Sequence, residues 1–474
     1  MKRFAIPAFA AVVLAGGAPL AYAQDSQSAP LVDQQGTIPL QTAIDAAMRA
    51  NPEILQAQYN KEAIQFERRQ AEGLFGPSVD VEASAGIRRL ENSTRRNLGI
   101  ADDELFPVDI GITGQWTAID FGRRRGELLR QAARVDGASL RVLERSEFIA
   151  LEVSRQYLDV LLQQRVQAAA SDNRRFHELL VSDLSQGVAQ GSISIADQQQ
   201  AEERMQAAVV REEEARRSVT QAQISLRALT GLDIYGAVLP PSLAAQLPTG
   251  LEQAVGLART RNPLVREAQA DVDAANAVVQ SAEADLYPTI GVEVSGRVGD
   301  DIDGFSGETN DLQGRMVFRW NVFDSGIRAA RVQETVRQAS IARYTLHQRQ
   351  REAEEDVRSA WNALETQGRI STALERQSTV SDDLLLSYRS QFNIGRRSLL
   401  DVLDAQNTRF NTQVRLETAR FSELFARYQI LAATNSFLDS MDLEPGTGSG
   451  ETERVRFEYG PPIEAELQRR VYPG

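Results

Sequence analysis

Acidic side chains in two equivalent motifs are the residues of this chain whose types and spacing could do chemistry. The motif Gly-x-x-Ser-x-x-Asp-x-x-x-Ala occurs twice, with Ser194 and Asp197 in the first copy and Ser398 and Asp401 in the second. The second copy adds Asp404, which lies one helical turn after Asp401 and repeats the negative charge on the same helix face. These groups can hold charge or cap a helix, but they do not form a nucleophile with its base.

Two roles for the motif carboxylates stay open. Asp197 and Asp401 each follow a turn marked by Gly191 or Gly395, and an aspartate at this place can cap the next helix. Capping explains Asp401 less completely, because the second carboxylate one turn on has no such role.

The composition removes most classes of enzyme and metal site. The 474 residues include no cysteine and two histidines, which excludes disulfides, thiolate metal sites and thiol nucleophiles and nearly excludes a multi-histidine metal centre. Lys and Arg number 52 against 65 Asp and Glu, giving a net charge of −13, whereas a nucleic-acid binder needs a basic face. We therefore expect no enzyme activity, no cofactor, no bound metal and no nucleic-acid partner.

The first 23 residues have the pattern of a secretory signal peptide. Lys2 and Arg3 precede an apolar run over residues 4–15, and Ala21-Tyr22-Ala23 supplies a cleavage site before Gln24. The alternative, a transmembrane anchor, needs a longer apolar run, and none of membrane-helix length follows residue 24. The pattern predicts an exported protein.

The rest of the sequence is one unit written twice. A shift of 211 residues, which becomes 204 after a deletion in the second copy, aligns the two halves. Matched pairs include Leu40 with Leu251, Asn51 with Asn262, Pro52 with Pro263, Trp116 with Trp320, Asp120 with Asp324, Gly122 with Gly326 and Gly191 with Gly395. The predicted units are a signal peptide (1–23), an N-terminal extension (24–36), a first repeat (37–235), a linker (236–250), a second repeat (251–437) and a flexible C-terminal tail (438–474).

Each repeat contains two alternating strands. Apolar residues recur at every second position over about 78–90 and 107–119, and again over about 289–298 and 312–323. About ten residues is the length that a tilted strand needs to cross a bilayer. A sandwich hairpin is the alternative, but so few strands in a long exported chain favour membrane strands.

Two long helical hairpins, predicted over about 122–231 and 326–435, follow the strands. Their apolar residues keep a spacing of three and four, which is typical of coiled-coil packing. Four strands cannot close a barrel, and lipid does not tolerate an open sheet edge, so several copies must combine. Eight strands from a dimer would enclose a filled interior, whereas twelve from a trimer would leave a channel. The predicted fold is mainly α with a small membrane β-barrel.

The duplicated helix-strand-strand-helix-helix plan and the two turn motifs resemble the TolC family of outer membrane channel proteins. The resemblance implies a homotrimer with a twelve-stranded barrel in outer membrane lipid, continued by an α-helical barrel in the periplasm. It also implies two partners, a periplasmic adaptor (membrane fusion protein) and an inner-membrane ABC or RND transporter, in type I secretion or drug efflux.

The same resemblance assigns roles to the turn residues. Asp401 and Asp404 match the carboxylates that constrict the periplasmic aperture, and Asp197 and Arg397 match a network that holds the tip closed. Gly191, Ser194, Gly395 and Ser398 match the hairpin-turn motif. Phe392 departs from a tyrosine of that network in some members, and Ala196 lacks a polar side chain, so a weaker or different latch is expected.

Two other interpretations are weighed against the channel. A periplasmic coiled-coil adaptor predicts one hairpin with compact β domains rather than a duplication, and a secreted enzyme lacks its nucleophiles and metal ligands here. Protein and small toxic molecules both remain possible cargo. The missing acylation cysteine favours secretion-type members, by family analogy alone.

Overall fold

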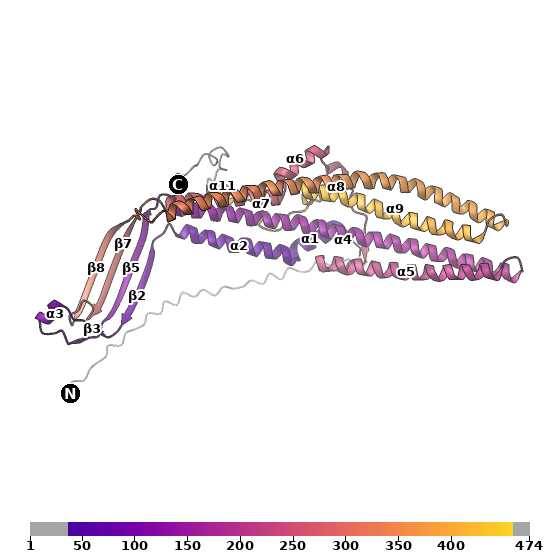
Figure 1. Ribbon diagram of the computed structural model, residues 1–474. Coiled ribbons are helices and arrows are strands. Elements are labelled where there is room, and N and C mark those ends of the chain that lie inside the picture. The colour runs from indigo at the N-terminus through magenta and orange to yellow at the C-terminus, as the bar shows by residue number, and fades with distance from the viewer. Residues whose placement is uncertain (1–36, 458–474) are drawn as a thin grey trace, which may run out of the picture.

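The computed structural model describes residues 37–457, which form an elongated molecule with a sheet at one end and long helices at the other (Figure 1). The predicted signal peptide, the N-terminal extension and residues 458–474 lie outside the described residues. No helix within residues 37–457 has both the length and the apolar character needed to cross a bilayer.

Two long hairpins make up most of the molecule. The first consists of α4 (Arg123–Ala189) and α5 (Ile195–Thr230), and the second of α8 (Ile327–Asn393) and α9 (Leu399–Ala433). A helix of 67 residues, the length of both α4 and α8, extends about 100 Å. The hairpins thus span residues 123–230 and 327–433, where the sequence predicted about 122–231 and 326–435.

Shorter helices pack beside the sheet-proximal halves of α4 and α8. They are α1 (Leu40–Ala50), α2 (Pro52–Gly73), α6 (Leu251–Arg261) and α7 (Pro263–Ala284). Asn51 and Asn262 occupy the same position in the two repeats: each caps the next helix through its side-chain oxygen and donates its amide to a carbonyl at the end of α5 or α9. These asparagines tie each short helix pair to its own hairpin.

Four antiparallel strands form the sheet in the order β2-β5-β7-β8. Their bounds are β2 (Ser78–Ala85), β5 (Val108–Ile119), β7 (Thr289–Asp300) and β8 (Glu308–Arg319). The two repeats meet where β5 pairs with β7. Within residues 37–457, the outer edges of β2 and β8 have no partner strand.

The first strand is shorter than predicted because the chain leaves the sheet after residue 85. It forms β3 (Arg88–Arg89), α3 (Ser93–Asn97) and β4 (Glu104–Leu105) at the far end of the sheet. The remaining small elements are β1 (Thr37–Ile38) paired with β6 (Gly236–Ala237), a 3-10 turn at Ala244–Gln246, α10 (Phe437–Ser440) and α11 (Glu453–Arg456).

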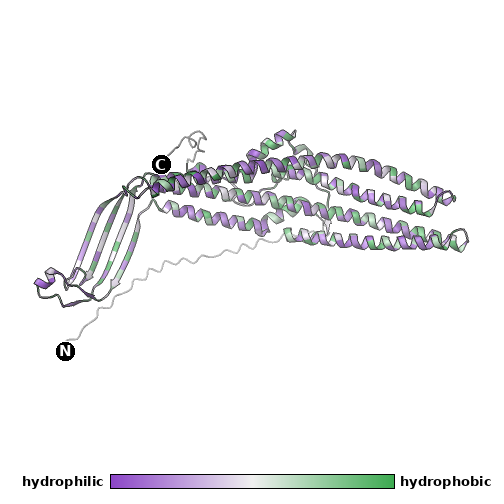
Figure 2. Ribbon diagram, in the orientation of Figure 1, coloured by the Kyte–Doolittle hydropathy of each residue, from purple (hydrophilic) through white to green (hydrophobic). Residues whose placement is uncertain are grey.

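The sheet has one apolar and one charged face, as the alternation predicted (Figure 2). Exposed apolar side chains on one face include Val81, Ile110, Ile112, Val294, Val298, Leu312 and Met316. On the other face Arg297 pairs with Asp109, and Arg315 and Arg319 both pair with Glu293. A large apolar surface that remains exposed in one chain needs lipid or another protein to cover it.

Buried seams hold each hairpin together. Six residues of α5 that follow the predicted spacing of three and four are buried, namely Ala201, Ala208, Ala215, Val219, Ala222 and Leu226. Between the repeats, α4 and α7 approach closely at Gly126, where an added Cβ atom would lie 2.8 Å from the Ser281 nitrogen. Glycine at this position therefore sets the distance between the two repeats.

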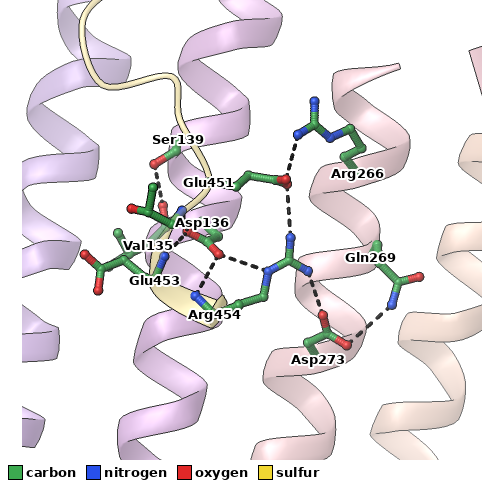
Figure 3. A network of polar contacts seen from close by, with 10 residues as sticks. Val135, Asp136, Ser139, Arg266, Gln269, Asp273, Glu451, Glu453 and Arg454 are labelled. Carbon is green, nitrogen blue, oxygen red and sulfur yellow. Dashed lines mark hydrogen bonds and ion pairs between the residues drawn. The ribbon is translucent and has the colours of Figure 1, made fainter. Parts of the chain in front are cut away.

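The C-terminal segment packs against the helices, in contrast to the flexible tail that the sequence predicted. Residues 438–457 pack against α4 and the short helices beside it. Arg454 lies between two buried carboxylates, Asp136 of α4 and Asp273 of α7 (Figure 3). The Asp136 carboxylate also accepts three backbone N–H groups from residues 452–454. Glu453 pairs with Arg68 of α2 and Glu451 with Arg266 of α7.

The prediction of a flexible tail is therefore wrong for residues 438–457. The glycine-rich composition of this segment suggested flexibility. Its oppositely charged partners could not be identified from the sequence, because they belong to three helices far away along the chain. We call residues 445–457 the strap, because they join α2, α4 and α7.

We expect Arg454→Gln to destabilise the protein by about 3–5 kcal/mol, because it leaves two buried carboxylates without their cation. Thermal unfolding followed by circular dichroism in detergent measures the loss. The triple variant D136N/D273N/R454Q removes both charges and should recover much of it. A triple variant as unstable as R454Q would show that the ion pairs are not the cause.

Candidate functional site at the hairpin tips

The two hairpin turns are built alike around a glycine. Gly191 and Gly395 have φ values of +73° and +72°, a left-handed conformation that side chains rarely adopt. In each turn a backbone N–H one residue further on, of Ser192 or Arg396, donates to the carbonyl of Gly187 or Gln391 and closes the preceding helix. This explains the glycine of the motif.

The serine and aspartate of each motif cap the next helix. The Ser194 hydroxyl accepts the Asp197 backbone N–H at 3.1 Å and donates to its carboxylate at 2.7 Å. Ser398 and Asp401 repeat this arrangement, and the Asp401 carboxylate also accepts the Ser398 backbone N–H, which completes a capping box. Capping is thus one role of both aspartates in the structure.

The second tip carries more charge than capping requires. The Ser398 hydroxyl and backbone N–H, together with the nearby Arg397 charge, hold the pKa of Asp401 below its ordinary value. Asp404 lies one turn along α9 and is exposed. The turn therefore presents two solvent-facing carboxylates side by side.

Arg397 contacts groups of its own hairpin. Its Nε donates to the Gln391 side chain at 3.2 Å, its guanidinium lies 4.2 Å from the centre of the Tyr388 ring, and its Nη1 is 3.8 Å from the Asp401 carboxylate. Within one protomer Arg397 and Asp197 therefore do not pair.

Apolar side chains join the two hairpins near their tips. Leu180 and Leu184 of α4 form a buried cluster with Leu399 and Leu403 of α9, and Phe392 packs against them. Phe392 therefore contributes apolar packing between the two hairpins.

Polar side chains also join the two hairpins, and the sequence did not predict these contacts. The Gln406 side chain donates to Asn173 at 2.9 Å in a buried position, and Arg389 lies 3.7 Å from Asp183. The internal repeat could not reveal the first pair, because the shift of 204 aligns Asn173 with Gln377. A contact made once, between unlike helices, leaves no signal in a repeat alignment.

The strand-to-helix junctions, in contrast, are repeated. Asp120 accepts the Gly122 and Arg124 backbone N–H groups and pairs with the Arg124 side chain, and Asp324 does the same with Gly326 and Arg328. The shift of 204 aligns these arginines, so the sequence held a signal for them. They position the sheet rather than the tip.

Nothing in residues 37–457 resembles a metal centre, since no three His, Cys, Asp or Glu side chains are placed to hold an ion. The tip of the second hairpin concentrates negative charge at Asp401 and Asp404. No group at the described tip is placed to make or break a covalent bond.

Comparison with solved structures defines the class of protein first. A membrane protein from Pseudomonas aeruginosa superposes with a TM-score of 0.75 at 19% identity over 88% of this chain and 92% of that chain. The CmeC outer membrane channel of Campylobacter jejuni superposes with a TM-score of 0.75 at 14% identity, over 90% of both chains. The fold is that of outer membrane channel proteins.

The family follows from the sequence. The model of the outer membrane efflux protein family matches residues 43–232 and 254–436, which cover both repeats. The chain belongs to this family. Outer membrane efflux protein BepC of Brucella suis biovar 1 is 27% identical over 280 residues, which are 59% of this chain and 61% of BepC.

Family membership decides between the interpretations left open by the sequence. The resemblance to the TolC family is confirmed, and the periplasmic adaptor is rejected because an adaptor would not match this family over both repeats. The family consists of channel proteins rather than enzymes.

We expect Ser398→Ala to lower the free energy of unfolding by about 0.5–2 kcal/mol through loss of the cap. Because the pKa of Asp401 is lowered on folding, its contribution is present above the ordinary aspartate pKa and lost as the pH falls through the folded value. At acidic pH, the free energy of unfolding should therefore fall less steeply with decreasing pH in S398A than in the wild type. Unfolding followed between acidic and neutral pH tests this, and an unchanged profile would contradict it.

Proposed function

We propose that three copies of this chain form a passive exit duct through the outer membrane and across the periplasm. The observation that carries the proposal is the four-stranded sheet with two unpaired edges, joined to helices about 100 Å long. Lipid does not satisfy open backbone groups, so β8 of one copy pairs with β2 of the next. Three copies give a barrel of twelve strands, wide enough for a channel.

The two faces of the sheet match this arrangement. The apolar face, with Val81, Ile112 and Leu312, is suited to lipid, and the ion-paired face, with Asp109, Glu293 and Arg297, is suited to a water-filled interior. The charged pairs then line the pore, where water screens them.

The hairpin tips form the periplasmic entrance in this proposal. Three copies bring three Asp401 and three Asp404 carboxylates around one opening, and such a ring attracts cations and repels anions. Arg397 and Asp197, which do not meet within one protomer, are left to make closed-state contacts between neighbouring protomers.

A passive duct of this kind takes the energy for transport from other proteins. We propose that the hairpins dock a periplasmic adaptor, which connects the duct to an inner-membrane ABC or RND transporter. The family name and the name of BepC support efflux as the activity.

We expect Val81→Arg to impair membrane insertion by about 2–4 kcal/mol if Val81 lies near the bilayer midplane. Thr113→Arg is the matched control, since Thr113 pairs with Asp80 at nearly the same depth on the opposite face. Native mass spectrometry and outer membrane fractionation should show fewer V81R trimers and normal T113R trimers. Equal yields of both variants, or a wild type that stays monomeric, would contradict the barrel.

We expect D401A/D404A to reduce cation selectivity and block by trivalent cations in planar bilayers, because the variant removes six carboxylates from the entrance. Asp383→Asn is the control, as an exposed aspartate of α8 away from the turn. If the aspartates serve only as caps, the double variant will lose thermal stability and keep its selectivity. That outcome would reject the aperture assignment and leave the duct intact.

A further inference from the structure

A cavity of about 510 Å³ lies between the two hairpins, where α7 begins and α9 ends. We call it the waist cavity. Its apolar lining includes Phe148 and Leu151 of α4, Leu264 of α7 and Ala360 of α8. Its size is that of pockets that hold drug-sized molecules, and its walls combine apolar surface with a few polar groups.

Carboxylates supply the charge of the waist cavity. Glu144 and Glu147 stand on α4 and Asp356 on α8, and the described lining includes no lysine, arginine or histidine. Glu144 is paired with Arg145, so its charge is compensated. The other two carboxylates face the cavity without a cation in its lining.

Glu147 is the least compensated of these groups. Its side chain is buried, and its Oε2 atom has no hydrogen-bond partner among the described residues. The Leu438 backbone N–H donates to the carboxylate, but burial and the nearby Asp439 charge raise the pKa of Glu147 to about 8. Partial desolvation and the neighbouring Glu355 and Glu352 charges also raise the pKa of Asp356, although this residue remains exposed.

A buried acid of this kind costs stability. The raised pKa of Glu147 means that its contribution to stability is present below the ordinary glutamate pKa and is lost as the pH rises towards 8. A glutamine would fit the same space without this loss. Strongly shifted carboxyl groups in a cavity are typical of sites that meet a ligand.

We propose that the waist cavity binds an organic cation with an apolar body, whose positive charge pairs with Glu147. A metal ion is a poor candidate, because no three acidic or histidine side chains of the described residues are placed to hold one. An apolar cation would cover the lining of Phe148 and Leu264 and supply the missing counter-charge. The inference rests on the proposed duct, to whose wall it adds a ligand site for an amphipathic organic cation.

The test is calorimetric titration of the full-length protein in detergent with tetraphenylphosphonium, using tetraphenylborate as an anion of the same shape. Titration into protein-free micelles corrects for partitioning. We expect saturable binding of the cation and none of the anion. Affinity should rise with pH and level off above about 8, because the bound cation favours ionised Glu147.

Glu147→Gln is the decisive variant, and it should fold at least as well as the wild type. We expect it to bind the cation at least about tenfold more weakly, since each unit by which the cation lowers the pKa of Glu147 is a factor of ten, and to lose the pH dependence. Glu214→Gln is the matched control, because Glu214 is an exposed glutamate of α5 that does not line the cavity.

Three results would overturn the proposal: no saturable binding at pH 8, equal binding of the anion, or E147Q binding as well as the wild type. Conductance of the same preparation in planar bilayers tests the duct separately. A conducting channel that fails to bind the cation rejects the waist site alone. A binding protein that forms no channel rejects the duct.

Discussion

The aspartate–arginine pair at each strand-to-helix junction is the interaction on which the rest of the structure depends. Asp120 and Asp324 accept the first N–H groups of α4 and α8, and Arg124 and Arg328 extend from these carboxylates to carbonyls of the preceding segments. The chain passes through left-handed conformations at both junctions, which cost energy unless such bonds compensate. The angle between sheet and helices follows from these two pairs, and with it the alignment of the proposed pore.

The helical part is held together unevenly along its length. Near the sheet, the strap places Arg454 between two buried carboxylates and links three helices. Near the tips, the buried Asn173–Gln406 contact uses only part of its capacity, because Asn173 Nδ2 and Gln406 Oε1 have no partner in the described chain. Segments with fewer satisfied polar contacts open at lower cost.

The tip shows how far a motif can be interpreted without the fold. Gly395, Ser398 and Asp401 were recognisable because a turn, a cap and a charge each need a particular residue type at fixed spacing. The contacts of Arg397 could not be recognised in this way, because its position beside Tyr388 and Gln391 depends on the path of the turn after α8. Within one protomer the contacts of Arg397 are with Gln391, Tyr388 and Asp401, all of its own hairpin.

The sequence by itself determined the duplication, the four alternating strands, the long hairpins and the turn motifs, because each depends on periodicity or on local backbone chemistry. Only the tertiary structure decided which helices meet. It therefore revealed the strap, the contact of Asn173 with Gln406, and the Glu147 Oε2 atom that has no partner among the described residues. The strap contacts and the Asn173–Gln406 contact join residues at least 181 positions apart, and each occurs once. A periodic pattern repeats along the chain and can be found in it, whereas a single long-range contact exists only after the helices have packed.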